Sequence, residues 1–166
     1  MRRSRRRLAL ALPAALGLAA CGFELRRVPQ MQFQRIQLTG FAAKSPLGAE
    51  LRQSIDGSAD TRVVDSAAQA QVIFEALTDT RDRSVVASTA TGLVREVQLR
   101  ARLQFRLRTP GGRELIEPTE LVQVRELSYN EGIALAKQYE EAAQFRNMQT
   151  DIVAQVIRRL AAVKEI

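Results

Sequence analysis

A strict alternation of apolar and polar residues between Val97 and Arg108 is the most regular pattern in the chain. The apolar positions are Val97, Leu99, Ala101, Leu103, Phe105 and Leu107, and the polar positions are Gln98, Arg100, Arg102, Gln104, Arg106 and Arg108. Successive side chains of a strand point to opposite faces of a sheet. The pattern therefore predicts a long strand with one face on a core and the other face in water.

Further strand-like segments surround this one. Phe33 to Leu38 predicts a short strand, and Val72 to Ser88 is rich in residues that favour strands. Arg62 to Val64 is a candidate for one more short strand. Pro110-Gly111-Gly112 predicts a tight turn into a strand from about Leu115 to Val124. That strand contains Pro118, which has no amide hydrogen, so it is expected to be interrupted or to lie at a sheet edge.

Two segments have helical spacing instead. Ser45-Pro46 predicts a helix start, because serine caps helix N-termini and proline fits the first turn. Leu47, Leu51 and Ile55 follow at helical spacing, and Gly57 stands where this helix would end. From about Asn130 the period becomes helical again. The apolar stripe of that second helix is Phe145, Met148, Ile152, Val153, Val156, Leu160 and Val163.

The order strand, helix, three longer strands and long helix predicts an α+β fold. Its economical form has two helices packed on one face of a mostly antiparallel or mixed four-stranded sheet. The chain has 166 residues, of which 46% are hydrophobic and 26% charged. That length and composition fit a single globular domain with a real core, expected to cover residues 21–166.

Residues 1–20 have the organisation of a bacterial lipoprotein signal peptide. A basic head, Arg2 to Arg7, precedes an apolar run from Leu8 to Leu18. This run is well short of the roughly 20 residues that span a bilayer. Leu18-Ala19-Ala20-Cys21 resembles the lipobox, so Cys21 is the expected site of lipid attachment; the alternative is a buried structural cysteine.

The expected location is the periplasmic face of the outer membrane. Gly22 follows the cysteine, where an aspartate would favour retention in the inner membrane. The arginine-rich head also resembles a twin-arginine signal, although the ordinary secretory route is the default.

Charge and composition exclude several functions. The net charge of +7 includes five arginines among the first seven residues, and without them 25 − 5 = 20 basic residues face 18 acidic ones. The mature chain is therefore not expected to bind nucleic acid. The chain has no histidine and one cysteine, which excludes a Ser/His/Asp triad, a Cys/His pair, a His-ligated metal and an intrachain disulfide. We expect a protein that is not an enzyme and has no cofactor besides its lipid anchor.

The arginines on the polar face of the long strand have two interpretations. Arginine binds phosphate and carboxylate groups in a forked geometry, so Arg100, Arg102, Arg106 and Arg108 could hold an anionic ligand. Alternatively, they pair with glutamates of the neighbouring strand, such as Glu114, Glu117 or Glu120. The row alone favours the second interpretation.

Three stretches of the chain resemble the LPS-assembly lipoprotein family LptE. Cys21-Gly22-Phe23-Glu24-Leu25-Arg26 resembles the family's start, a lipidated Cys, Gly, an aromatic residue, any residue, Leu and Arg. Ser45-Pro46-Leu47-Gly48 resembles the start of its first helix. Ala134-Leu135-Ala136-Lys137, with Glu140, Met148, Gln155, Ile157, Arg158 and Leu160, resembles its C-terminal helix. The likeness in order and length covers nearly all of the mature chain.

The resemblance implies a non-enzymatic role in the outer membrane. Such a protein plugs and supports the β-barrel LptD, with which it forms a heterodimer, and binds lipopolysaccharide during its insertion into the outer leaflet. It makes Lys137 a candidate for contact with a lipid phosphate. Family members can carry a basic residue beside the hairpin glycine, but here Ala90-Thr91 precede Gly92. Arg95 or the pair Arg100 and Arg102 would then supply the second cation. The alternative function is a free-standing periplasmic lipoprotein that binds another anionic lipid or glycan.

Overall fold

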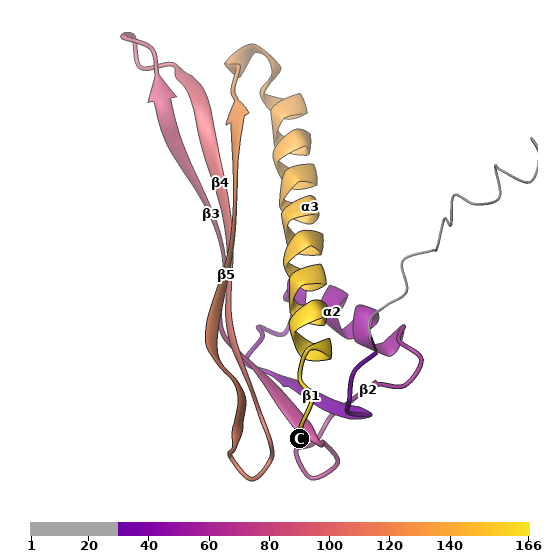
Figure 1. The fold of residues 1–166 in the computed structure, drawn as a ribbon. Helices are drawn as coiled ribbons and strands as arrows, with labels where there is room; N and C mark the ends of the chain where they lie inside the picture. The colour runs from indigo at the N-terminus through magenta and orange to yellow at the C-terminus, as the bar shows by residue number, and fades with distance from the viewer. Residues whose placement is uncertain (1–29) are drawn as a thin grey trace, which may run out of the picture.

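The computed structural model describes residues 30–166, which form a five-stranded sheet with helices on one side (Figure 1). The signal peptide and Cys21 lie outside this range. In chain order the elements are β1 (Arg35–Thr39), α2 (Pro46–Asp56), β2 (Arg62–Val64), β3 (Val72–Ser88), β4 (Val94–Arg108), β5 (Glu114–Ser128), the 3₁₀ turn η2 (Glu131–Ile133) and α3 (Ala134–Ala161). Within this range, no helix combines the length and apolar character needed to cross a bilayer.

The strand order is β2-β1-β3-β4-β5, so the α+β class is confirmed but the expected number of four strands is wrong. The additional strand is β2, which pairs in parallel with β1, Ile36 lying opposite Val63. Three residues are too few to establish a period of two. The side chain of Asp56, at the end of α2, accepts a hydrogen bond from the Val63 amide at 2.8 Å and helps to fix β2 beside β1.

The alternation along β4 is confirmed, because its apolar positions from Val97 to Leu107 are all buried. They face the apolar stripe of α3, in which Met148, Ile152, Val156 and Leu160 are fully buried. Phe74 of β3 stacks on Phe105 with ring centroids 4.9 Å apart. The core therefore lies between the sheet and α3, and α2 joins it in the lower part of the molecule in Figure 1.

Both expectations for the strand that contains Pro118 are confirmed. β5 is an edge strand. Its pairing with β4 shifts between Phe105↔Thr119 and Leu107↔Ile116, so an extra residue of β5 is left in a bulge around Pro118. A residue without an amide hydrogen is tolerated there because the ladder is already interrupted.

A polar contact fixes α2 against α3 and the sheet. Gln149 of α3 is only 7% exposed. Its amide group donates to the Pro46 carbonyl oxygen at 3.0 Å and to the Glu50 carboxylate, and it accepts from Arg81 of β3. Ser45 caps α2 by accepting from the Gly48 amide at 3.0 Å, and it donates to Asp79 of β3 at 2.6 Å. These bonds satisfy polar groups that would otherwise be costly to bury.

Gly40, directly after β1, lies close to the backbone of β3, and substitution of this glycine tests that close approach. It has a φ of +82°, and a Cβ atom there would lie 2.0 Å from the carbonyl oxygen of Ala76. Gly112 in the β4–β5 turn has a φ of +94° but no atom near such a Cβ. Gly112→Ala should cost only the positive-φ strain, about 1–2 kcal/mol. Gly40→Ala should cost about 1–3 kcal/mol more, because the carbonyl must also move. Urea unfolding measures both, and equal losses would contradict the packing at Gly40.

Candidate functional site

Two of the proposed ligand-binding residues, Arg95 and Lys137, lie at the same end of the molecule, which we call the distal end. It consists of the β3–β4 turn, the end of β5 and the first turn of α3, and it is the upper end in Figure 1. The Tyr129 amide donates to the Arg95 carbonyl oxygen at 2.8 Å. Arg95 at the start of β4 therefore lies beside the end of β5. The chain continues from there through η2 into the turn of α3 that carries Lys137.

Lys137 lies on the stripe of α3 that faces the sheet. Its side chain is only 13% exposed, and its ammonium group binds Glu140 at 2.8 Å. Glu141 lies one turn further along the same stripe, because residues four apart are neighbours on a helix. The Arg83 guanidinium of β3 donates to Glu141 through Nε at 3.1 Å. Lys137 is thus paired within its helix, one turn before the residue that binds the Arg83 guanidinium.

A cavity of 240 Å³ opens at the distal end. It is lined by Leu93, Val94, Arg95, Tyr129, Asn130 and Gly132. The guanidinium group of Arg83 lies 5.4 Å from the centre of the Tyr129 ring, within the range of a cation–π contact. Arg95 therefore lines the cavity, and Arg83 contacts the ring of Tyr129, which is another lining residue.

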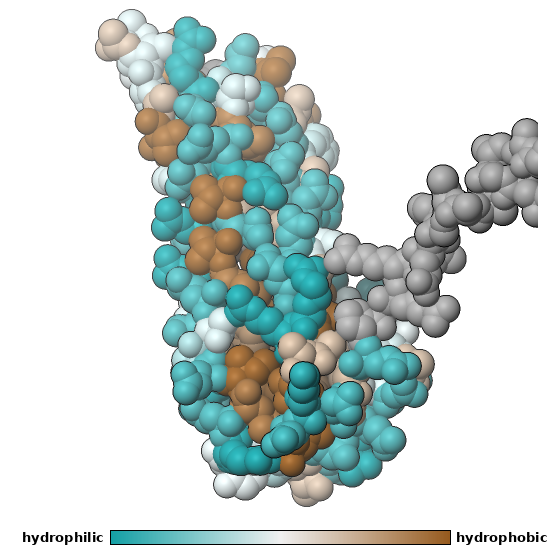
Figure 2. Space-filling view, viewed as in Figure 1, coloured by the Kyte–Doolittle hydropathy of each residue, from teal (hydrophilic) through white to brown (hydrophobic). Residues whose placement is uncertain are grey.

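Apolar side chains are exposed at the same end. Brown surface is visible at the upper end in Figure 2. The exposed apolar residues of the distal end are Val85, Val86, Leu93, Ile133, Leu135 and Tyr139, with 47% to 69% of their surface exposed. Among them, Leu93 lines the cavity together with Arg95. The cavity therefore combines an apolar and a cationic group, which suits a ligand that is both anionic and partly apolar.

Arg100 and Arg102 lie on the opposite face of the sheet. They alternate with the buried residues Leu99, Ala101 and Leu103, so their side chains point away from α3. Arg102 lies 3.4 Å from Glu120, and Arg100 donates a long hydrogen bond of 3.4 Å to Gln98. A small ligand group cannot contact these two arginines and Lys137 together, because the sheet lies between them. The geometry groups Arg95 with Lys137.

The remaining arginines of the row are engaged in ion pairs. Arg106 lies 2.8 Å from Glu75 and 3.5 Å from Glu114, and Arg108 lies 3.5 Å from Glu75. The hydrogen bond from Arg106 lowers the pKa of Glu75 below its ordinary value. Pairing with Glu114 and Glu120 agrees with the sequence analysis, whereas Glu117 makes no ion pair within residues 30–166. Glu75 was missed because it belongs to β3, whose register with β4 is set by the tertiary structure.

Sequence reasoning also missed Arg83 and Glu141. Arg83 lies opposite the buried residue Leu99 and so points to the helix side of the sheet. A register shift between Ala76 and Thr78 places a bulge near Leu77, which changes the face to which the later residues of β3 point. The sequence could not assign Arg83 to the helix side, because a charged residue at an inward position does not match a core pattern. The bulge also reverses the face expected from the first half of β3.

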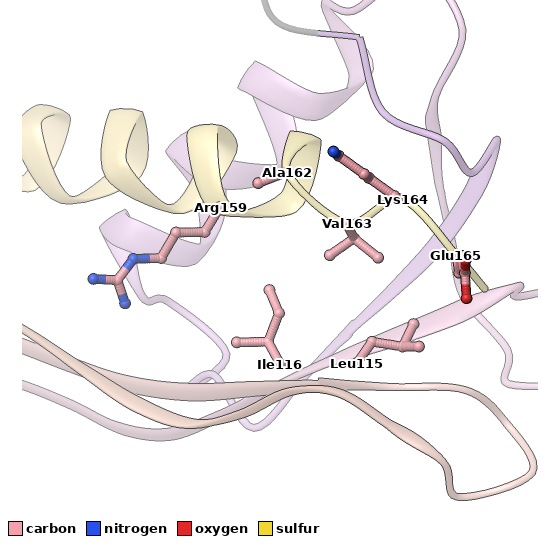
Figure 3. A pocket seen from close by; sticks show the side chains of 7 residues that line it. All are labelled: Leu115, Ile116, Arg159, Ala162, Val163, Lys164 and Glu165. Atoms are coloured by element: carbon pink, nitrogen blue, oxygen red, sulfur yellow. The ribbon is translucent and has the colours of Figure 1, made fainter.

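A second, larger hollow lies far from these cations. Figure 3 shows this groove of 480 Å³ between the end of α3 and the start of β5, with Leu115, Ile116 and Val163 pointing into the gap. It contains neither Lys137 nor Arg95. Among residues 30–166, no group of three or more acidic, Cys or His side chains could hold a metal ion.

The class of protein follows from comparison with solved structures of bacterial lipoproteins. Lipoprotein B from Nitrosomonas europaea aligns with a TM-score of 0.73 and 30% identity over 85% of this chain and 91% of its own. Rare lipoprotein B from Shewanella oneidensis has a TM-score of 0.65 and 21% identity over 78% of this chain and 95% of its own. A minor lipoprotein from Acinetobacter baumannii has a TM-score of 0.63 and 20% identity over 80% and 94%. The last two show the shared fold alone.

The family follows from the sequence. The family model LptE, described as lipopolysaccharide-assembly, matches residues 33–160. The chain therefore belongs to the LptE family of lipopolysaccharide-assembly lipoproteins, as its resemblance indicated. A comparison with curated protein sequences finds no match.

The ion pairs of Glu75 predict a pH dependence of stability. Because its pKa is lowered in the folded state, the stabilisation is present at pH values above 4.5, its ordinary pKa, and is lost as the pH falls through the folded value. Glu75→Gln should therefore be less stable than the wild type at pH 7, and the difference should shrink below pH 4.5. Urea unfolding at several pH values measures this difference. A difference that stays constant down to the lowest pH would contradict the assignment.

Proposed function

We propose that this protein is an outer-membrane lipoprotein that plugs and supports the β-barrel LptD and binds lipopolysaccharide during its insertion into the outer leaflet. The observation that carries the proposal is the family match over residues 33–160, which covers nearly the whole described domain. The protein would act without making or breaking covalent bonds. Its contributions would be the shape of a long sheet and helix and the charges at the distal end.

Lipid attachment to Cys21 would hold the domain at the periplasmic face of the outer membrane. One acyl chain gives only marginal membrane binding, so two or three chains on one cysteine make a stable anchor. Cys21 precedes the first described residue, Gln30, by 30 − 21 = 9 positions. Even a fully extended segment of this length spans at most about 30 Å. The anchor would therefore keep the domain close to the membrane.

The distal end would bind the ligand. Lys137 and Arg95 supply cations for lipid phosphates, and the exposed apolar residues around them, such as Leu93 and Ile133, suit acyl chains. Lysine binds phosphate as a point charge, whereas arginine offers a fork of donors. Arg100 and Arg102 would not take part in this site, because they lie on the other face of the sheet. They would instead be directed toward the surroundings of that side of the sheet.

The alternative is a free-standing periplasmic lipoprotein that binds another anionic lipid or glycan through the same cations. Family membership favours the barrel-associated role. The two functions differ in whether the protein has a stable protein partner in the membrane.

Labelling of cells with a radioactive fatty acid, followed by mild detergent extraction, tests both anchor and partner. We expect the labelled chain to be recovered in a complex with a large β-barrel protein. Recovery of the labelled chain alone would favour the free-standing alternative. An unlabelled chain would exclude the anchor on Cys21.

Reversal of the charge at Lys137 tests the ligand site. Lys137→Asp should weaken binding of purified lipopolysaccharide by roughly ten- to a hundredfold, because a charge-assisted contact contributes about 1.5–3 kcal/mol. Lys44→Asp is the matched control, since Lys44 is exposed before α2 and far from the distal end. Circular dichroism checks that both variants stay folded. Equal affinities of the two variants would remove Lys137 from the site.

A further inference from the structure

The distal half of α3 is held against the sheet by charged contacts as well as by apolar packing. Below it, Met148, Ile152 and Val156 are fully buried. Beside and above these residues, the inward positions of β3 carry Arg81 and Arg83 in place of apolar residues. On α3, Gln149 accepts a hydrogen bond from Arg81, and Glu141 forms an ion pair with Arg83. This part of the interface between α3 and the sheet therefore contains charged and polar partners beside its apolar contacts.

Arg83 has the geometry of a ligand-binding residue whose partner is internal. Its Nε atom donates to both oxygens of Glu141, at 3.1 and 3.2 Å, and its guanidinium lies over the ring of Tyr129. Its side chain remains 38% exposed, whereas that of Glu141 is 15% exposed. The other nitrogens of the guanidinium are thus still accessible to an anion that approaches from solvent, since arginine carries five donors in its fork.

Arg83 also lies beside the groups already assigned to the proposed ligand site. Glu141 is one helical turn from Lys137, and side chains spaced this way are neighbours. Tyr129, against which Arg83 stacks, lines the same cavity as Arg95. Lys137 is in turn paired with Glu140 at 2.8 Å. Arg83 and Lys137 are thus each held by a carboxylate of α3, and these two carboxylates belong to consecutive residues.

We propose that Arg83 is a second phosphate-binding cation of the distal site, and that Glu141 occupies it until a lipid phosphate displaces the carboxylate. This inference rests on the proposed binding of lipopolysaccharide. A phosphate that bridges Arg83 and Lys137 would meet the negative charge of Glu141 at short range. Like charges at such distances repel each other, so the carboxylate lowers the affinity for the ligand while it stabilises the free protein.

The proposal predicts effects of opposite sign for the two partners of this ion pair. Arg83→Gln should weaken lipopolysaccharide binding about five- to tenfold, because a charge-assisted contact is lost. Glu141→Gln should strengthen it about three- to tenfold, because the competing charge is removed while a hydrogen-bond acceptor for Arg83 remains. Titration of the purified mature protein with lipopolysaccharide measures both affinities.

A matched pair on the same two layers provides the control. Arg125 of β5 lies 3.3 Å from Asp151 of α3, and neither residue lines the distal cavity. Arg125→Gln and Asp151→Asn should leave the affinity unchanged. With dephosphorylated lipopolysaccharide, the differences produced by Arg83→Gln and Glu141→Gln should disappear.

Other outcomes would overturn the inference. If Arg83 and Glu141 only hold α3 to the sheet, both substitutions should weaken binding. The Arg125 and Asp151 variants should then weaken binding as well. If Lys137→Asp weakens binding but Arg83→Gln does not, the proposed function stands and Arg83 is excluded from the site. If the wild type binds neither form of the lipid, the proposed ligand itself fails.

Discussion

The burial of one face of β4 against α3 is the interaction on which the rest of the structure depends. β4 lies between β3 and β5, and its apolar side chains from Val97 to Leu107 are buried without exception. This sets the side on which both helices pack, because the opposite face carries arginine and glutamine. The apolar layer does not extend with equal strength along the whole sheet, since the second half of β3 presents Arg81 and Arg83 to α3. Arg81 and Arg83 thus lie beside the buried residues Ala101 and Leu99, so the layer mixes charged and apolar groups toward the distal end.

The face of the sheet on which an arginine lies decides whether it is paired with glutamates of the sheet or available to a ligand. On the open face of the sheet, Arg106 and Arg108 converge on Glu75, and Arg102 lies beside Glu120. These arginines are used in cross-strand pairing, which is the interpretation that the sequence favoured for the row. On the helix side, Arg95 and the exposed Leu93 line a cavity, and Arg83 contacts Tyr129, which also lines it. An amphipathic ligand can use the second arrangement, and the first already has its partners.

The length of α3 separates the proposed site from the core. Lys137 stands in its first turns and Leu160 at its end, an interval of about 35 Å at 1.5 Å per residue. Met31 and Phe33, the first buried residues of the described chain, belong to the core at the other end. A protein anchored shortly before these residues would present the distal cations far from its attachment point. This arrangement suits the lipopolysaccharide-assembly role of the LptE family.

The sequence by itself determined the elements whose patterns are local. The period of β4, the cap Ser45-Pro46, the turn before β5 and the stripe of α3 each depend on residues within a few positions of one another, so they could be predicted, and the motifs indicated the family. The tertiary structure alone decided which distant segments meet. The pairing of β2 with β1, the bulge in β3 and the meeting of Arg83 with Glu141 depend on contacts between residues up to 58 positions apart. No local period records such contacts, because register and face are fixed only when the layers pack.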